Sequence, residues 1–368
     1  MRFILYTPKG VKTGGPEAIH QLNYALKELG HECYLLATWG TSRKSSIPDY
    51  EKYKPVFVPW WSLKRGDVVI IPEYFSRIPY YISQRVDSLV YWWLSVDNCP
   101  FAWAQNTKFS SNTFWSTHAK TTNNRKNPFF KRLLLIPSFI KFEGRIVAVR
   151  TSAMLYKLFS TRIELSKVIH IFQSAYAKEF VRSELKLEGL MVSDYTRQKV
   201  ELSIKESKKV ELNKKLSGFT IVYNPSKGLA HVSILEKILE PKVTFIPLQG
   251  FTYGQLLYLF DNADLYLDLG SLPGKDRLPR ESILAGCPIM ITTWGAGYNS
   301  TDFPVPNKYK LRMDVTPPRE AAQSILNILE LGKSENLKMQ KYFQDLVSQE
   351  KAIFYKEVCE FANLFVNP

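Results

Sequence analysis

The sequence predicts an α/β protein made of two successive parallel sheets, followed by a C-terminal helical segment. Three observations support this prediction. Short apolar runs alternate with segments of helical period in both halves of the chain. Polar loops, several of them rich in glycine, follow the apolar runs. A charge-dense stretch with few core residues separates the two halves. The length of 368 residues also exceeds what one core of ordinary size needs.

The first forty residues read as strand, glycine loop, helix and strand. "RFILY" at 2–6 is an apolar run typical of a buried parallel strand. Pro16 suits the first turn of a helix, where its missing N–H costs nothing, and Gly30 suits the end. Helical spacing places four aliphatic side chains on one face: Ile19, Leu22, Leu26 and Leu29. "CYLLA" at 33–37 returns as the next strand, so a parallel βαβ unit is predicted.

The remaining elements continue this alternation. Further strands are predicted at 67–72, 89–96, 168–174, 219–223, 243–248, 264–270 and 287–293. Helices are predicted at 232–239, at 252–263 with Thr252 as N-cap, and over most of 318–364.

Domain boundaries follow from these runs. Residues 1–200 form the first domain, with a basic insertion at about 105–160, and 201–217 form a linker. Residues 218–345 form the second domain, and the helix at 346–368 is expected to return to the first domain.

The insertion is strongly basic and also apolar. From His118 to Arg150 it carries eight Lys or Arg residues against one acid, Glu143. It reads either as a core-packed insertion with a basic outer face or as an interfacial patch on an anionic membrane.

Composition narrows the class of partner. The net charge of +15 favours anionic ligands, an acidic membrane surface or nucleic acid. The four cysteines are scattered, without metal or disulfide spacing, which favours a reducing cytoplasmic setting. No apolar run approaches a membrane span, so any contact with the inner face of the plasma membrane would be peripheral. Nucleic acid is disfavoured, because no recognition motif appears.

Three polar loops are placed where open parallel sheets bind ligands, beyond the carboxyl ends of strands. Glycines in such loops let backbone N–H groups approach an anion. A lysine there adds a point charge, and an arginine can hold a phosphate through its planar fork. The carboxylate of Glu281 is better suited to accept hydrogen bonds from sugar hydroxyl groups than to bind a phosphate. The candidate ligand-binding residues are Gly14, Gly15, Asn224, Lys227, Gly228, Lys275, Asp276, Arg277, Arg280 and Glu281.

Asp97, in "SVDN" at the end of a predicted strand, is the first candidate for a general base. Its alternative role is to cap a turn. Glu73 is the second candidate, and His118 and His20 are weaker ones. The predicted catalytic residues are therefore Asp97 and Glu281. No paired-aspartate metal motif is present, so neither a metal nor a cofactor is expected.

Four segments resemble retaining glycosyltransferases with the GT-B fold, in which two Rossmann-like domains face a cleft. They are "TGGPEAIHQLNYALKELGHECYLL" (13–36), "HIFQSAYAKEFV" (170–181), "YNPSKG" (223–228) and "PRESILAGCPIM" (279–290). The resemblance implies a cleft loop at Gly14 and Gly15. It also implies that Lys227 contacts the donor diphosphate and that Glu281 contacts the ribose. "WWLSVDN", "NPSKG" and "PGKDRLPRE" together resemble glycosyltransferases of bacterial polysaccharide gene clusters.

The sequence departs from this family at one position. A second glutamate usually stands eight residues before Glu281, where this chain has Pro273 among basic residues. The extra cations could hold a phosphoribosyl diphosphate donor, or they could replace a metal at the leaving diphosphate. The leading hypothesis is a glycosyltransferase that moves a sugar from a nucleotide-diphosphate donor to a glycan or lipid-linked acceptor in cell-surface polysaccharide biosynthesis. The alternatives are a phosphoribosyl-diphosphate-dependent transferase of the same fold and a non-catalytic transferase-like partner protein.

Overall fold

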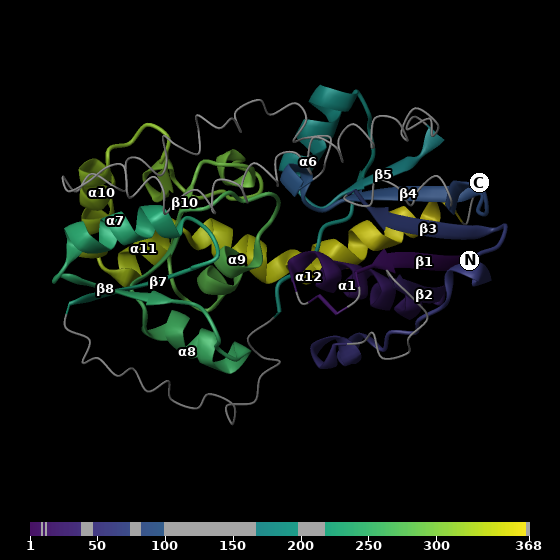
Figure 1. The fold of residues 1–368 in the computed structure, drawn as a ribbon, viewed down its shortest axis with the longest axis horizontal. Coiled ribbons are helices and arrows are strands. Elements are labelled where there is room, and N and C mark those ends of the chain that lie inside the picture. Colours follow the sequence, from purple (N-terminus) through teal and green to yellow (C-terminus); the bar gives the residue numbers. More distant parts are fainter. Residues whose placement is uncertain are drawn as a thin grey trace, which may run out of the picture.

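The computed structural model describes residues 1–8, 10–11, 13–37, 47–73, 82–98, 167–197 and 218–365. The basic insertion at 105–160, with His118, and the linker at 201–217 lie outside the described residues. The described chain forms two lobes side by side, each built on a parallel sheet (Figure 1). Lobe 1 contains β1–β6, and lobe 2 contains β7–β11.

The sheet of lobe 1 has the strand order β2-β1-β3-β4-β5-β6, and all neighbouring strands are parallel. Its strands are β1 (Arg2–Thr7), β2 (Glu32–Ala37), β3 (Asp67–Pro72), β4 (Ser88–Trp93), β5 (Ile169–Phe172) and β6 (Leu190–Met191). Helix α1 (Gly14–Glu28) crosses from β1 to β2, and α6 (Ala175–Phe180) follows β5. Apolar side chains bury both faces of the sheet, as near-continuous apolar strands require.

The sheet of lobe 2 has the order β11-β10-β9-β7-β8, again fully parallel. Its strands are β7 (Phe219–Tyr223), β8 (Val243–Pro247), β9 (Leu265–Asp268), β10 (Ile289–Thr292) and β11 (Lys310–Leu311). Its helices are α7 (Leu229–Leu239), α8 (Tyr253–Asn262), α9 (Arg277–Leu284), α10 (Pro318–Glu330) and α11 (Lys333–Met339). Together these elements enclose one apolar core.

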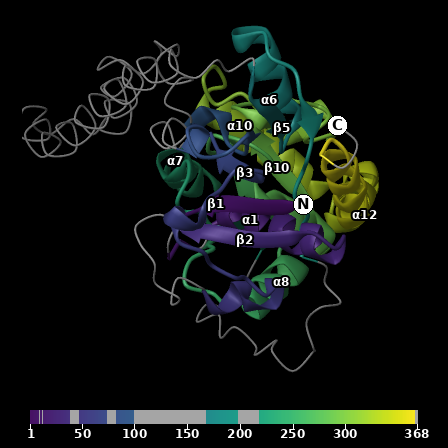
Figure 2. The same cartoon turned by 90° about the vertical axis from the view of Figure 1, so that its right-hand side faces the viewer.

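Helix α12 (Lys341–Asn363) runs from lobe 2 to lobe 1 and lies along one side of the molecule (Figures 1 and 2). Phe343 and Val347 near its start belong to the core of lobe 2. Phe354, Val358 and Phe361 pack with α1 against the sheet of lobe 1. A single helix therefore contributes apolar side chains to both cores.

The predicted fold class is confirmed in its two parallel sheets with intervening helices. Thr252 caps α8 in a capping box with Gln255, as predicted, and Gly30 follows the end of α1 with a φ of +84°. The main difference lies after β4, which ends at Trp93 rather than continuing to residue 96. The backbone N–H groups of Leu94 and Ser95 donate to the buried Glu73 carboxylate, so the chain leaves the sheet there. Among the described residues, no helix is long and apolar enough to cross a membrane.

Candidate functional site

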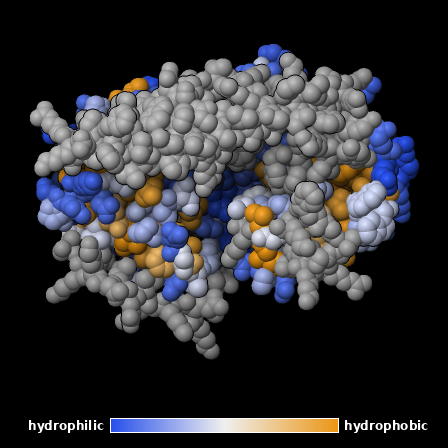
Figure 3. Space-filling view, viewed as in Figure 1, coloured by the Kyte–Doolittle hydropathy of each residue, from blue (hydrophilic) through white to orange (hydrophobic). Residues whose placement is uncertain are grey.

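The facing edges of the two sheets carry the predicted loops. In each sheet the strand order reverses beside the first strand, between β1 and β3 and between β7 and β9. Ligands of open parallel sheets bind outside the carboxyl ends of strands at such a reversal. The segment after β9 reaches lobe 1, where the backbone N–H of Lys275 donates to the Gln173 side chain at 3.1 Å. The surface is hollowed between the lobes, and hydrophilic residues are visible inside the hollow (Figure 3).

The loop after β7 holds Lys227 against the loop after β9. Asn224 folds it into a tight turn, because its side-chain oxygen accepts the N–H of Ser226 at 3.0 Å. Gly228 has a φ of +66°, and a Cβ on it would lie 2.5 Å from the Leu269 carbonyl carbon, so only glycine fits. The Lys227 ammonium donates to the Ser271 carbonyl at 3.1 Å and pairs with Asp276. The structure thus brings together Asn224, Lys227, Gly228 and Asp276.

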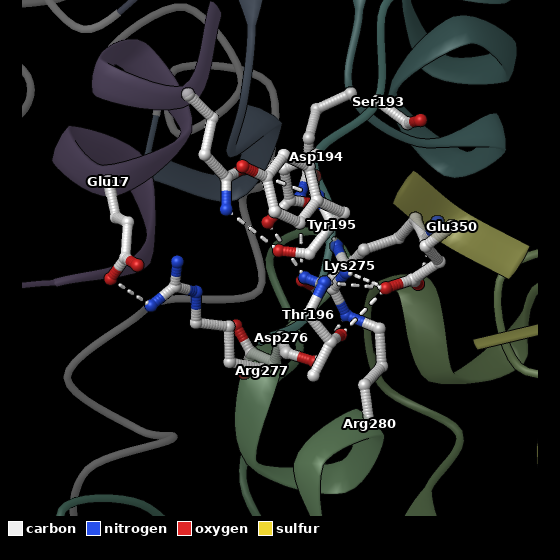
Figure 4. A network of polar contacts seen from close by, with 12 residues as sticks. Glu17, Ser193, Asp194, Tyr195, Thr196, Lys275, Asp276, Arg277, Arg280 and Glu350 are labelled. Atoms are coloured by element: carbon white, nitrogen blue, oxygen red, sulfur yellow. Dashed lines mark hydrogen bonds and ion pairs between the residues drawn. The ribbon is translucent and has the colours of Figure 1, made fainter. Parts of the chain in front are cut away.

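A second charged group joins the start of α1 to the start of α9 (Figure 4). Glu17 accepts two hydrogen bonds from Arg197 at 2.9 Å each and a third from Nη1 of Arg277. Burial alone would raise the pKa of Glu17, but Arg277 and Arg197 hold it well below its usual range. Gly14 lies against the Arg277 side chain, since a Cβ built on it would be 3.8 Å from the Arg277 Cδ. The glycine loop of lobe 1 and α9 of lobe 2 are therefore neighbours.

Glu281 lies one helical turn after Arg277 on α9 and is buried. Its carboxylate accepts no hydrogen bond from any residue in the described part of the chain. Burial raises its pKa, and the nearby Arg277 and Arg197 oppose that rise. A buried carboxylate without hydrogen-bond donors has its acceptor capacity free for a ligand's hydroxyl groups.

Asp97 lies where the two lobes touch. It accepts a hydrogen bond from the Tyr176 hydroxyl at 2.6 Å and another from the Ser271 hydroxyl of lobe 2 at 3.3 Å. A Cβ on Gly295 would lie 2.8 Å from the Asp97 carboxylate, so the lobes meet closely here. Burial raises the pKa of Asp97, which favours proton acceptance nearer neutral pH. Within the described ranges, its oxygens contact hydroxyl groups and no turn N–H.

Glu73, the second candidate base, is enclosed beneath the turn that carries Asp97. Its two oxygens accept the N–H groups of Leu94 at 2.9 Å and Ser95 at 2.6 Å. Burial raises its pKa to about 7, although these hydrogen bonds oppose the rise. Glu73 therefore positions the turn, and its buried side chain is remote from solvent.

Glu73 is expected to make the free energy of unfolding decrease as the pH rises. Its pKa is about 7 in the folded protein against an ordinary 4.5, so the folded state binds the proton more tightly than the unfolded chain. The resulting stabilisation is full below the ordinary pKa and is lost as the pH rises through the folded-state pKa. The free energy of unfolding of the wild type minus that of Glu73→Gln should fall by about 2–3 kcal/mol between about pH 5 and about pH 8, because only the wild type has the titrating carboxyl. A difference that stays constant in denaturant titrations would contradict this assignment.

The side chains of Arg280 and Lys275 both pair with Glu350 of α12. The Arg280 side chain is fully buried, and all three of its nitrogens donate hydrogen bonds. Nη1 binds Glu350 at 2.9 Å, Nη2 binds Asp194 at 2.9 Å, and Nε binds the Asp276 carbonyl at 3.2 Å. The Lys275 ammonium pairs with the same Glu350 of α12 at 3.3 Å. We therefore correct the expectation that Arg280 holds a phosphate: it joins α9 to α12 and to the segment after β6, and Lys275 faces the same joint.

Several residues that form polar contacts around the site and between the lobes were not predicted. They are Glu17, Asp194, Arg197, Asp302 and Glu350. Asp302 of lobe 2 accepts the N–H groups of Ala175 and Tyr176 at the start of α6 in lobe 1. Glu17 stands directly after the Gly-Gly-Pro of α1, and that place in a helix start could have marked it as an anionic partner. His20 is buried, and its Nδ1 lies 2.7 Å from the Pro16 carbonyl oxygen, so it belongs to the packing of α1.

No cluster of acidic, histidine or cysteine side chains in the described part of the chain could hold a metal ion. No protein-family model matches the sequence. No curated protein matches it either.

Solved structures share the fold over the whole chain. Sucrose-phosphate synthase from Thermosynechococcus elongatus has a TM-score of 0.62 at 10% identity, with 100% of both chains covered. WaaG, a glycosyltransferase of lipopolysaccharide biosynthesis, has a TM-score of 0.56 at 11% identity, again with 100% of both chains covered. HepE of Anabaena, solved with UDP and glucose, has a TM-score of 0.58 at 13% identity, with 99% of both chains covered. The chain thus has the GT-B fold of glycosyltransferases, as the sequence resemblance implies.

Proposed function

We propose that this protein is a glycosyltransferase that uses a donor with a diphosphate leaving group. The observation that carries the proposal is the convergence of the Lys227 loop, Glu281 and Asp97 between two lobes of the GT-B fold. Each group stands beyond the carboxyl end of a parallel strand, where such folds bind ligands. HepE, which shares the fold, was solved with UDP and glucose.

In this proposal the diphosphate binds at the loop after β7. The Lys227 ammonium, now paired with Asp276, supplies positive charge where the C1–oxygen bond to the diphosphate breaks and negative charge develops. Stabilisation of that leaving charge contributes most of the rate acceleration. Glu281 accepts hydrogen bonds from sugar hydroxyls of the donor's ribose, which give its unpartnered carboxylate the donors that it lacks. These side chains together position the donor on lobe 2.

The acceptor hydroxyl approaches from lobe 1. Its oxygen forms the new bond to C1, and Asp97 takes its proton. Tyr176 and Ser271 orient the Asp97 carboxylate from opposite lobes, so this base is in place when the lobes are closed. We infer that the acceptor is a glycan or lipid-linked sugar in cell-surface polysaccharide biosynthesis. The net charge of +15 favours work at the inner face of the plasma membrane.

A second donor class remains a candidate because of Pro273 and the cations that follow it. Phosphoribosyl diphosphate carries more negative charge than a nucleotide sugar, and Lys227 and Arg277 both stand at the proposed donor site. The two donor classes differ in the group that Glu281 would contact. A nucleotide sugar offers the ribose of its nucleoside, whereas phosphoribosyl diphosphate has no nucleoside and offers only the ribosyl group that is transferred.

A thermal-shift screen of nucleotide sugars, free nucleoside diphosphates and phosphoribosyl diphosphate tests the proposal. A ligand that binds only the folded state raises the melting temperature, by an amount that grows with its concentration over Kd. We expect one donor class to raise the melting temperature and to be consumed in the presence of an acceptor glycan. Binding without any transfer or hydrolysis would favour a non-catalytic partner protein. No shift with any diphosphate would refute the donor site.

A further inference from the structure

Arg277 has hydrogen-bonding capacity that the protein leaves unused. Its Nη1 donates to Glu17, but its Nε and Nη2 are buried and have no hydrogen-bond partner among the residues that the structure describes. Buried donors without partners are costly, and in native structures they often mark a functional site. The N–H groups of Nε and Nη2 point in parallel, with a spacing that matches two oxygens of a carboxylate or phosphate. Arg277 therefore presents a free fork on the edge away from Glu17.

The start of α1 lies beside this fork. A Cβ on Gly14 would be 3.8 Å from Cδ and 3.9 Å from Nε of Arg277. Helix α1 has 15 residues, and the side chain of its N-cap residue, Thr13, makes no capping hydrogen bond within the described part of the chain. The N–H groups of Gly14 and Gly15 have no acceptor within the helix, and Pro16 has no N–H to offer. The positive end of the α1 dipole and the positive charge of the Arg277 guanidinium therefore lie side by side at the start of α1.

This group is distinct from the diphosphate loop. The Lys227 ammonium is held by Asp276 and Ser271 within lobe 2, whereas Arg277 reaches across to Glu17 and Gly14 of lobe 1. Arg277 and Glu281 are four residues apart on α9, so they lie on the same face of the helix. A donor that fills the space between the lobes therefore meets the Arg277 fork in addition to the Lys227 ammonium and Glu281.

We propose that Arg277 and the start of α1 form an oxyanion subsite for a carboxylate or phosphate on the glycosyl group of the donor, in addition to the leaving diphosphate. The inference rests on the proposed function and narrows its substrate class to acidic or phosphorylated sugars. Both free nitrogens are buried where the two lobes meet, so this proposal requires the lobes to part before the oxyanion can enter. Glu17 stays neutralised during this motion, because it keeps its two hydrogen bonds to Arg197.

Two variants isolate the subsite. Arg277→Lys keeps the charge beside Glu17 but loses the planar fork. Gly14→Ala places a methyl group at ordinary contact distance from Arg277, so the chain folds while the space beside Nε is reduced. Arg312→Lys is the matched control, because Arg312 is an exposed arginine of the same lobe.

Donor pairs that differ only in one acid group provide the readout. UDP-glucose against UDP-glucuronate, with matched pairs on other nucleotides, tests for a carboxylate, and phosphoribosyl diphosphate tests for a phosphate. In thermal-shift titrations we expect the acid-bearing donor to bind at least about tenfold more tightly than the neutral one. Arg277→Lys and Gly14→Ala should each bring the affinities for the acid-bearing and the neutral donor to within about twofold of each other, whatever they do to neutral-donor binding itself. The Arg312→Lys protein should keep the wild-type preference. Equal affinity for both donors, or an unchanged preference in both variants, would overturn the subsite.

Inorganic phosphate separates this inference from the proposed function if no donor binds. Phosphate should still raise the melting temperature of Lys227→Met, where the fork is intact, more than that of Arg277→Lys. Rises of equal size in the two variants would overturn the subsite independently of any glycosyl transfer.

Discussion

Replacement of Arg280 by methionine is expected to lower the free energy of unfolding by about 3–5 kcal/mol. The guanidinium is fully buried between Asp194 and Glu350, each bound at 2.9 Å. Methionine fills much of the same volume but leaves both carboxylates buried beside an apolar side chain. Burial raises the pKa of Asp194 and Arg280 lowers it, and the net direction is downward, so the carboxylate depends on the arginine for its ionised form.

Denaturant unfolding of the variant measures this loss. Arg312→Met is the matched control, since Arg312 pairs with Asp314 on the surface at 3.4 Å and exposed pairs of this kind are worth little. The deficit of Arg280→Met should decrease at acidic pH, because Arg280 no longer holds the pKa of Asp194 down and protonation removes that buried negative charge. A loss as small as that of the control would show that Asp194 and Glu350 do not need this cation.

Replacement of Lys227 by methionine is expected to lower kcat by about 10²–10³-fold. The side chain supplies the cation at the proposed diphosphate site, and methionine keeps its length without its charge. Stability should change little, because Lys227 and Asp276 are both about a quarter exposed and remain partly hydrated.

Steady-state transfer with the donor identified by ligand screening measures this effect. Lys237→Met on the exposed face of α7 is the control, as it removes the same charge from the same lobe. Turnover that is unchanged in Lys227→Met would exclude a leaving diphosphate at this loop.

The fold could be predicted from the sequence because its signals are local. Each parallel strand is buried on both faces, so strands such as 67–72 and 219–223 stand out as apolar runs between polar loops. Capping by Thr252 depends on side chains within four residues, and it too is visible in the sequence.

The roles of the cations could not be predicted in the same way. Arg277 and Arg280 are three residues apart on one short helix and look equivalent in the sequence. Their roles differ because Arg280 meets carboxylates 86 and 70 residues away, whereas Arg277 meets one 260 residues away. Only tertiary packing decides which guanidinium is fully occupied and which keeps a free edge.

The path of α12 has a consequence for biosynthesis. Phe361 lies against Phe3, with ring centroids 6.1 Å apart, so the last helix completes the hydrophobic layer that the first strand begins. Because α12 follows every strand of lobe 1 in the chain, this apolar layer stays uncovered during synthesis until α12 has been made. We infer that nascent chains of this protein are exposed to aggregation until α12 packs, and that a chain without Lys341–Asn363 leaves the core of lobe 1 incomplete.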